Sequence, residues 1–192
     1  MYHKVKSSRA VKGLWSLPNN LTFYRIATIP VMIGFLLFPN KFCSLMAAIL
    51  FSSASITDLL DGFFARRHGT VSDFGRFLDP LADKLLISAA LIMLIPMGRV
   101  PAWIVFIIVG REIAVTGLRG ILASKGIVIS ASLLAKYKTG FQIAAIIPLL
   151  IHYPYLGIHF HVVGKFFLIP AVILTIWSGV DYFTKFFRLT RE

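Results

Sequence analysis

Five of the eight acidic residues of this chain are aspartates that lie between positions 58 and 83. Four of them form two pairs, Asp58 with Asp61 and Asp79 with Asp83, and Asp73 lies outside this pattern. Residues three or four apart lie on one face of a helix, so each pair would present two carboxylates in one direction. Two antiparallel helices joined by residues 67–74 would turn these faces toward each other. The spacing therefore predicts one site with four carboxylates.

Four carboxylates in a poorly hydrated place repel one another, and the loss of water penalises their charged forms. Bound divalent cations would remove this conflict. Ligand sets made only of oxygen favour Mg²⁺ or Mn²⁺ over zinc, and two such ions about 3.5–4 Å apart suit displacement reactions at phosphorus. The residues leave one alternative open, an ion-pair network in which Lys84 and the neighbouring arginines neutralise the aspartates for structure alone.

Small and basic residues accompany these carboxylates. Gly62 and Gly75 have no side chain, so a ligand could approach the backbone closely at both positions. Arg66 lies about one turn beyond Asp61, where its guanidinium group could bind a phosphate or a carboxylate with two parallel hydrogen bonds. The segment is therefore suited to an anionic, phosphate-bearing ligand.

The composition shows what kind of protein must position these residues. Hydrophobic residues make up 57% of the 192 residues and charged residues only 15%, and the mean hydropathy is +0.80. One soluble core would leave large apolar surfaces in water, which excludes an ordinary soluble domain. The net charge of +12 comes from residues that flank apolar runs, which favours a membrane surface over nucleic acid as partner. The single cysteine, Cys43, excludes a disulfide framework.

Six apolar runs are long enough to span a bilayer, for which about 20 residues are needed. Their short connections predict an all-α integral membrane protein with six transmembrane helices in one bundle and a single domain, 1–192. Residues 1–20 form an amphipathic N-terminal segment, read as a short interfacial helix, with a basic tail as the alternative. The six runs are Leu21–Phe38, Phe42–Leu60, Leu78–Met97, Pro101–Leu122, Lys138–Tyr155 and Val162–Phe183.

The distribution of basic residues predicts the orientation of the bundle. Lysines and arginines accumulate on the cytoplasmic side of membrane proteins. With a cytoplasmic N-terminus, most of the 20 Lys and Arg residues fall in inner segments. Both termini and the carboxylate site are then cytoplasmic, in the inner (cytoplasmic) membrane of the cell. Three basic residues fall on the outer ends: Lys41, Arg99 and Lys165.

The carboxylate segment reads D-x-x-D-G-x-x-A-R, eight residues, then G-x-x-x-D-x-x-x-D, which resembles the signature of the CDP-alcohol phosphotransferase family. This resemblance implies a homodimeric six-helix membrane fold that transfers a phosphate-ester group from a CDP-linked donor to an alcohol and releases CMP. It implies that four aspartates hold two divalent ions, Mg²⁺ or Mn²⁺, with Asp83 also the general base, and that the small residues and Arg66 shape the CDP site. The matching positions are Asp58, Asp61, Gly62, Ala65, Arg66, Gly75, Asp79 and Asp83.

Shorter motifs resemble the phosphatidylglycerophosphate synthase branch of this family. They are the opening Pro18-Asn19-Asn20-Leu21-Thr22 with Arg25, the segment Arg111-Glu112-Ile113 with Arg119, and Lys136-Tyr137-Lys138-Thr139 with Gln142. The branch implies CDP-diacylglycerol as donor and glycerol 3-phosphate as acceptor, with Asn19 and Thr22 at the CDP site. The Lys136 segment has Ala135 where the branch is expected to have glycine.

The acceptor also follows from charge. Glycerol 3-phosphate brings a dianion that needs fixed cations, whereas serine brings no phosphate. Arg111, Arg119, Lys136 and Lys138 are available for this role, and Arg111 lies within a span, where an unpaired cation is costly. A structural ion pair for Arg111 and simple cytoplasmic anchoring for the two lysines are the alternatives. For the whole protein, another acceptor (serine, inositol phosphate or phosphatidylglycerol) and a small cation transporter remain open.

Overall fold

The computed structural model describes residues 17–38, 40–68, 73–124, 126 and 133–190, and of residues 17–20, 58–68, 73–77, 79, 133 and 190 it describes the backbone alone. This part of the chain forms six helices and one short hairpin. The predicted amphipathic segment, residues 1–20, lies largely outside it. The elements are α2 (Leu17–Leu36), α3 (Lys41–His68), α4 (Asp73–Leu94), α5 (Ala102–Ser124), α6 (Leu133–Ile151), β1 (Pro154–Tyr155), β2 (Ile158–His159) and α7 (Phe160–Thr190).

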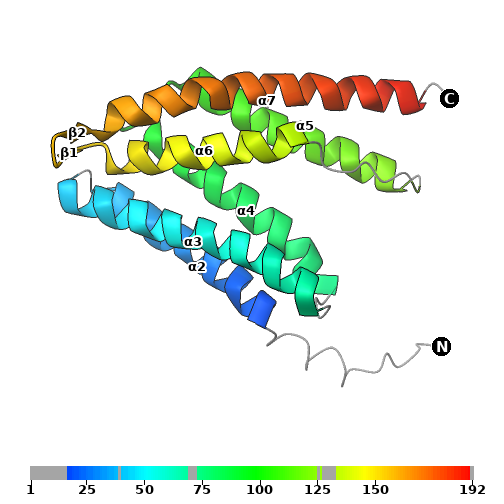
Figure 1. Ribbon diagram of the computed structural model, residues 1–192, viewed down its shortest axis with the longest axis horizontal. Coiled ribbons are helices and arrows are strands. Elements are labelled where there is room, and N and C mark those ends of the chain that lie inside the picture. The colour runs from blue at the N-terminus through cyan, green and yellow to red at the C-terminus, as the bar shows by residue number, and fades with distance from the viewer. Residues whose placement is uncertain (1–16, 39, 69–72, 125, 127–132, 191–192) are drawn as a thin grey trace.

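The helices alternate in direction along a common long axis (Figure 1). The first turns of α2, α4 and α6 and the last turns of α3, α5 and α7 all lie at the end opposite to the hairpin. Helix α6 packs most extensively on α7, α2 packs on α3 and α4, and α5 packs on α7. The up-and-down order predicted from the short connections is confirmed for the described helices.

The apolar core occupies the half of the bundle nearer the hairpin. All six helices contribute to it, and each contributes residues from the part that lies toward that end. Long, branched and aromatic side chains fill it, which excludes water and leaves the opposite half for polar groups. Representative members are Met32, Phe51, Leu91, Ile108, Ile146 and Leu168.

Arg99, between α4 and α5, connects three segments at the hairpin end. Its guanidinium group is buried and donates hydrogen bonds to the backbone oxygens of Leu149 (3.1 Å) and Leu150 (2.6 Å) and to Ser44 Oγ (2.8 Å). The last carbonyl groups of a helix have no partner within the helix. Arg99 therefore caps α6 and ties it to α3.

The hairpin corrects the predicted fifth span, which was expected to continue as helix to Tyr155. Helix α6 ends at Ile151, and His152 adopts a positive φ of 61°, the left-handed conformation that often follows a helix end. Pro154 then starts β1, which pairs with β2. Leu156 and Gly157 both have positive φ, the requirement of a tight two-residue turn.

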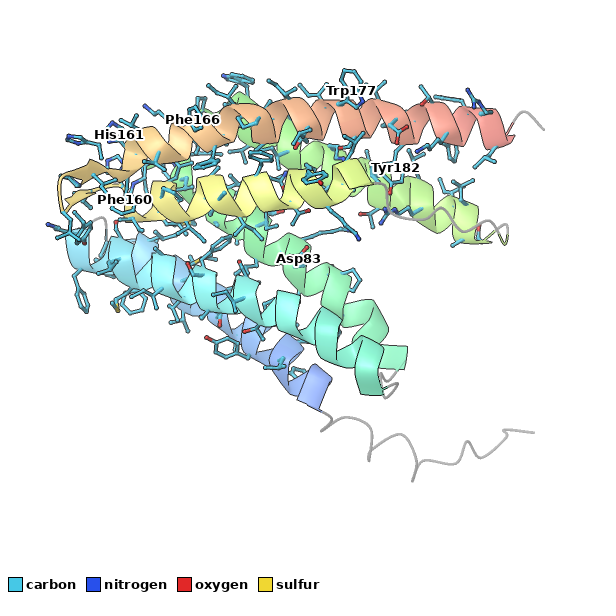
Figure 2. The ribbon with its side chains drawn as sticks, viewed as in Figure 1. Asp83, Phe160, His161, Phe166, Trp177 and Tyr182 are labelled. Carbon is cyan, nitrogen blue, oxygen red and sulfur yellow. The ribbon has the colours of Figure 1, made fainter. Side chains whose placement is uncertain are left out.

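Two helices are long and apolar enough to span a membrane, within Leu134–Ile151 and Phe160–Leu189, and α2 and α3 contain the shorter apolar stretches Leu21–Leu36 and Lys41–Thr57. Large apolar side chains cover much of the exterior, such as Phe106 and Trp177, and Figure 2 shows Trp177 on the outer face of α7. Such a surface is suited to lipid rather than to water.

Candidate active site

An ion-paired group of three side chains joins α5 to α6. Glu112 Oε1 accepts a hydrogen bond from Arg111 Nη1 at 3.1 Å and another from Lys138 Nζ. The side chains of Arg111, Glu112 and Lys138 are 9%, 14% and 4% exposed. Two cations and one anion leave this buried group with a net positive charge, so it is suited to an additional anion.

Arg111 has hydrogen-bonding capacity to spare. Its Nε and Nη2 atoms are buried and have no hydrogen-bond partner in the described part of the chain. A buried donor without a partner costs free energy of about 1–3 kcal/mol, and more for a charged group. A bound anion would satisfy these donors, which makes Arg111 the strongest candidate for a ligand contact.

Tyr182 of α7 lies against both arginines of α5. Its ring centroid is 5.5 Å from Arg111 Cζ and 4.8 Å from Arg119 Cζ, and its hydroxyl accepts a hydrogen bond from Arg119 Nη2. The residue is 2% exposed. Figure 2 shows Tyr182 on α7 and Asp83 on α4.

Helix α4 meets this group through Asp83 and Lys84. Lys84 Nζ donates a hydrogen bond to Thr116 Oγ1, which donates in turn to the backbone oxygen of Glu112 at 2.6 Å. Asp83 is partly buried and lies within electrostatic range of Lys84 and Lys138. The predicted general base therefore lies next to the predicted acceptor site.

The remaining signature residues lie on the last turns of α3 and the first turns of α4. The alternation of the helices places both segments at the end opposite to the hairpin (Figure 1), toward which the second half of α5 and the first half of α6 also extend. Asp79 precedes Asp83 by four residues on α4, or about 6 Å along the axis. The side chains of Asp58, Asp61 and Asp79 lie outside the described residues, as do those of Asn19, Ala65 and Arg66.

No group of three metal-binding side chains occurs among the residues whose side chains are described. Of the four predicted carboxylate ligands, only Asp83 belongs to that part, so the metal site stays a prediction. The helix positions are compatible with it, because α3 and α4 bring both aspartate pairs to the same end of the bundle. A set of four carboxylates is the chemistry that Mg²⁺ and Mn²⁺ prefer.

The two predicted lysines of α6 separate. They are two residues apart, so they lie on different faces of the helix. Lys138 is buried and joins Glu112, whereas Lys136 is exposed and lines an apolar groove of about 450 Å³ with Tyr137, Gly140 and other residues of α6 and α7. The structure thus brings Arg111, Arg119 and Lys138 together and places Lys136 outside their group.

Sequence reasoning missed Tyr182 and undervalued Lys84 and Glu112. Tyr182 carries no charge and belongs to no motif. The sequence indicates Lys84 only as a neutraliser of the aspartates, and Glu112 only as part of the motif that begins with Arg111. The available signal was the position of a carboxylate and two lysines within or beside apolar spans, where ionisable groups need partners.

Comparison with known proteins defines the class of this fold and site. The family model described as CDP-alcohol phosphatidyltransferase matches residues 15–177. The chain belongs to the CDP-alcohol phosphatidyltransferase family, as its signature predicted.

Individual relatives narrow the resemblance. The chain is 44% identical over 188 residues to a protein of Bacillus subtilis (strain 168) named CDP-diacylglycerol–glycerol-3-phosphate 3-phosphatidyltransferase. The alignment covers 90% of this chain and 95% of that protein. A Rickettsia felis protein of the same name is 41% identical, with 88% and 93% coverage. A protein of Mycobacterium tuberculosis named probable phosphatidylglycerophosphate synthase is 38% identical, with 90% and 82% coverage.

Proposed function

We propose that this protein transfers the phosphatidyl group of CDP-diacylglycerol to glycerol 3-phosphate, yielding phosphatidylglycerophosphate and CMP in phospholipid biosynthesis. The names of the relatives that match nearly the whole chain support this activity. The structural observation that carries it is the buried group of cations beside Asp83, in which two donors of Arg111 have no partner among the residues that the structure describes.

The acceptor follows from the charge of this group. Arg111 and Lys138 share the single carboxylate of Glu112, and Arg119 lies against Tyr182, the same aromatic side chain that Arg111 contacts. A phosphate dianion would meet an excess of positive charge and free donors here, and charge-assisted hydrogen bonds are stronger than neutral ones. An acceptor without a phosphate, such as serine, brings one carboxylate balanced by its own ammonium group, so it would offset less of this positive charge than a phosphate dianion would.

The donor would lie between α3 and the first half of α4. Asp58, Asp61, Asp79 and Asp83 would hold two divalent ions, Mg²⁺ or Mn²⁺, which supply positive charge to the pyrophosphate of the donor. The small residues of the signature leave space for the nucleotide, and Arg66 supplies a further cation. The CDP-binding residues in this proposal are Asn19, Thr22, Asp61, Gly62, Ala65, Arg66 and Gly75.

The residues on the acceptor side perform the remaining steps. Arg111, Arg119 and Lys138 hold the acceptor phosphate, which orients its 1-hydroxyl group toward the donor. The hydroxyl oxygen forms a bond to the β-phosphorus while the bond from that phosphorus to the bridging oxygen breaks, and CMP leaves with that oxygen. The Asp83 carboxylate takes the hydroxyl proton. Fixed positions and charge provide most of the acceleration in such phosphoryl chemistry.

The proposal includes the membrane arrangement. The apolar exterior and the two helices that can span a bilayer support a membrane protein. Charged residues of the site interrupt the apolar runs of α4 and α5, which is compatible with spans that line an active site. We propose a six-span bundle in the inner membrane with both termini and the site on the cytoplasmic side, and a homodimer as the family resemblance implies.

One assay tests the reaction and its competitors. The purified full-length protein is incubated in mixed micelles with CDP-diacylglycerol, Mg²⁺ or Mn²⁺, and separately glycerol 3-phosphate, serine, inositol phosphate or phosphatidylglycerol. CMP release that depends on glycerol 3-phosphate, with phosphatidylglycerophosphate identified by mass, is the expected result. Turnover with another acceptor would change the substrate. Metal-dependent ion flux in vesicles without CMP release would instead support a cation transporter.

A further inference from the structure

One aromatic side chain lies between the two arginines that we assign to the acceptor. Arg111 and Arg119 are eight residues apart on α5, so their Cα atoms are about 12 Å apart along the helix. Their guanidinium carbons nevertheless lie 5.5 Å and 4.8 Å from the centroid of one ring, that of Tyr182. The guanidinium groups are therefore closer together than the backbone positions from which they extend.

The contacts of Tyr182 with the two arginines differ in kind. Both cations lie over the face of the ring, an interaction worth about 0.5–2 kcal/mol that needs no hydrogen bond. The hydroxyl accepts a hydrogen bond from Arg119 alone. Within the described part of the chain, Arg111 thus keeps Nε and Nη2 without partners, although its guanidinium group is held in place.

Helix α7 approaches Arg111 at a second point, one turn before Tyr182. A Cβ atom at Gly179 would lie 3.3 Å from Arg111 Cγ, closer than most such contacts. The aliphatic part of Arg111 therefore passes over a position without a side chain. Gly179 and Tyr182 are three residues apart and share a face of α7, so this face is shaped around the arginine.

We infer that Tyr182 is a positioning residue for the acceptor phosphate, acting through Arg111 and Arg119, and that Gly179 provides the space this arrangement needs. The inference rests on the proposed function, since it assigns the arginines to the acceptor. Two mobile cations would repel each other and lose conformational freedom on binding a dianion. The tyrosine holds them in position before the acceptor arrives, which lowers that cost.

The test compares steady-state kinetics of Tyr182→Phe and Tyr182→Leu with wild type. Tyr182→Phe removes the hydrogen bond to Arg119 and keeps the ring, so KM for glycerol 3-phosphate should rise about 3- to 10-fold. Tyr182→Leu removes the ring as well, and KM should rise about 30-fold or more. In both variants kcat should stay within about twofold, and KM for CDP-diacylglycerol should not change.

Tyr24→Phe is the matched control. Tyr24 joins α2 to α3 through a hydrogen bond to Ser53 Oγ at 2.8 Å, so this variant also removes one tyrosine hydroxyl between two helices. It should keep wild-type KM values. If the loss of any tyrosine hydroxyl between two helices loosened the bundle, Tyr24→Phe and Tyr182→Phe would both raise the KM values of both substrates. That pattern would overturn the inference.

A double variant tests whether Tyr182 acts through Arg119. In an Arg119→Gln background, Tyr182→Phe should change KM for the acceptor by less than about twofold, because the partner of the hydroxyl is already absent. A full, multiplicative effect would refute this route. Gly179→Ala should raise acceptor KM through the displaced side chain of Arg111, and wild-type KM in this variant would remove Gly179 from the arrangement.

The failure of the inference can be told from the failure of the proposed function. The function fails if wild type does not use glycerol 3-phosphate in the acceptor panel. The inference fails if wild type uses it and the Tyr182 variants keep its KM. Binding can also be measured without turnover. Glycerol 3-phosphate should raise the unfolding temperature of the wild-type protein in detergent, and Tyr182→Leu should need a higher concentration of glycerol 3-phosphate for the same rise.

Discussion

Replacement of Arg111 by Gln tests the acceptor site most directly. The change removes a buried cation whose Nε and Nη2 atoms have no partner among the described side chains, while an amide can still donate to Glu112. Each charge-assisted hydrogen bond to a phosphate contributes about 1.5–3 kcal/mol. Loss of one such bond should raise KM for glycerol 3-phosphate roughly 10- to 100-fold, and loss of both bonds should raise it further.

The assay measures CMP release while the concentration of each substrate is varied in turn. KM for glycerol 3-phosphate should rise by the stated factor, and KM for CDP-diacylglycerol should stay near the wild-type value. Arg111→Lys should recover only part of the loss, because an ammonium group keeps the charge but not the planar fork.

Lys185→Gln is the control for Arg111→Gln. Lys185 is an exposed cation on α7 that pairs with Asp181 at 2.7 Å, so its loss removes a positive charge outside the site. Both KM values should stay unchanged. A raised KM for the donor with an unchanged KM for the acceptor in Arg111→Gln would refute the reasoning and move Arg111 to the pyrophosphate.

Three further perturbations have distinct expected results. Asp83→Asn should lower kcat by roughly 10²–10⁴-fold while CDP-diacylglycerol still binds, and near-normal turnover would remove Asp83 from the role of general base. Asp58→Ala and Asp61→Ala should each lose activity together with bound metal, with partial recovery in excess Mn²⁺; full activity of the wild type after exhaustive chelation would contradict the metal site. Arg99→Met should lower the unfolding temperature in detergent, because buried carbonyl groups lose their donors at a cost of about 1–3 kcal/mol each. A change in either KM would show that Arg99 does more than cap α6.

The acceptor group shows where prediction from local pattern ends. Helical periodicity correctly separates the faces of one helix, but it does not say which face of a neighbouring helix lies opposite. The motif and the charges predict that Lys136 and Lys138 both bind the acceptor phosphate, whereas the packing of α6 buries Lys138 against Glu112 and leaves Lys136 on the exterior. Tyr182 is 63 residues from Arg119, and no local signal connects them.

Composition and local spacing were enough to predict the family, the helical architecture and the two aspartate pairs. These properties depend on composition and on spacings of three and four residues, which act within one helix and are independent of its neighbours. Three features could be recognised only in the packed bundle: Glu112 joins Arg111 to Lys138, Tyr182 lies between two arginines, and α6 ends before the hairpin. These features depend on contacts between helices far apart in the chain, where packing and the burial of charge select one arrangement among many that the same helices could adopt.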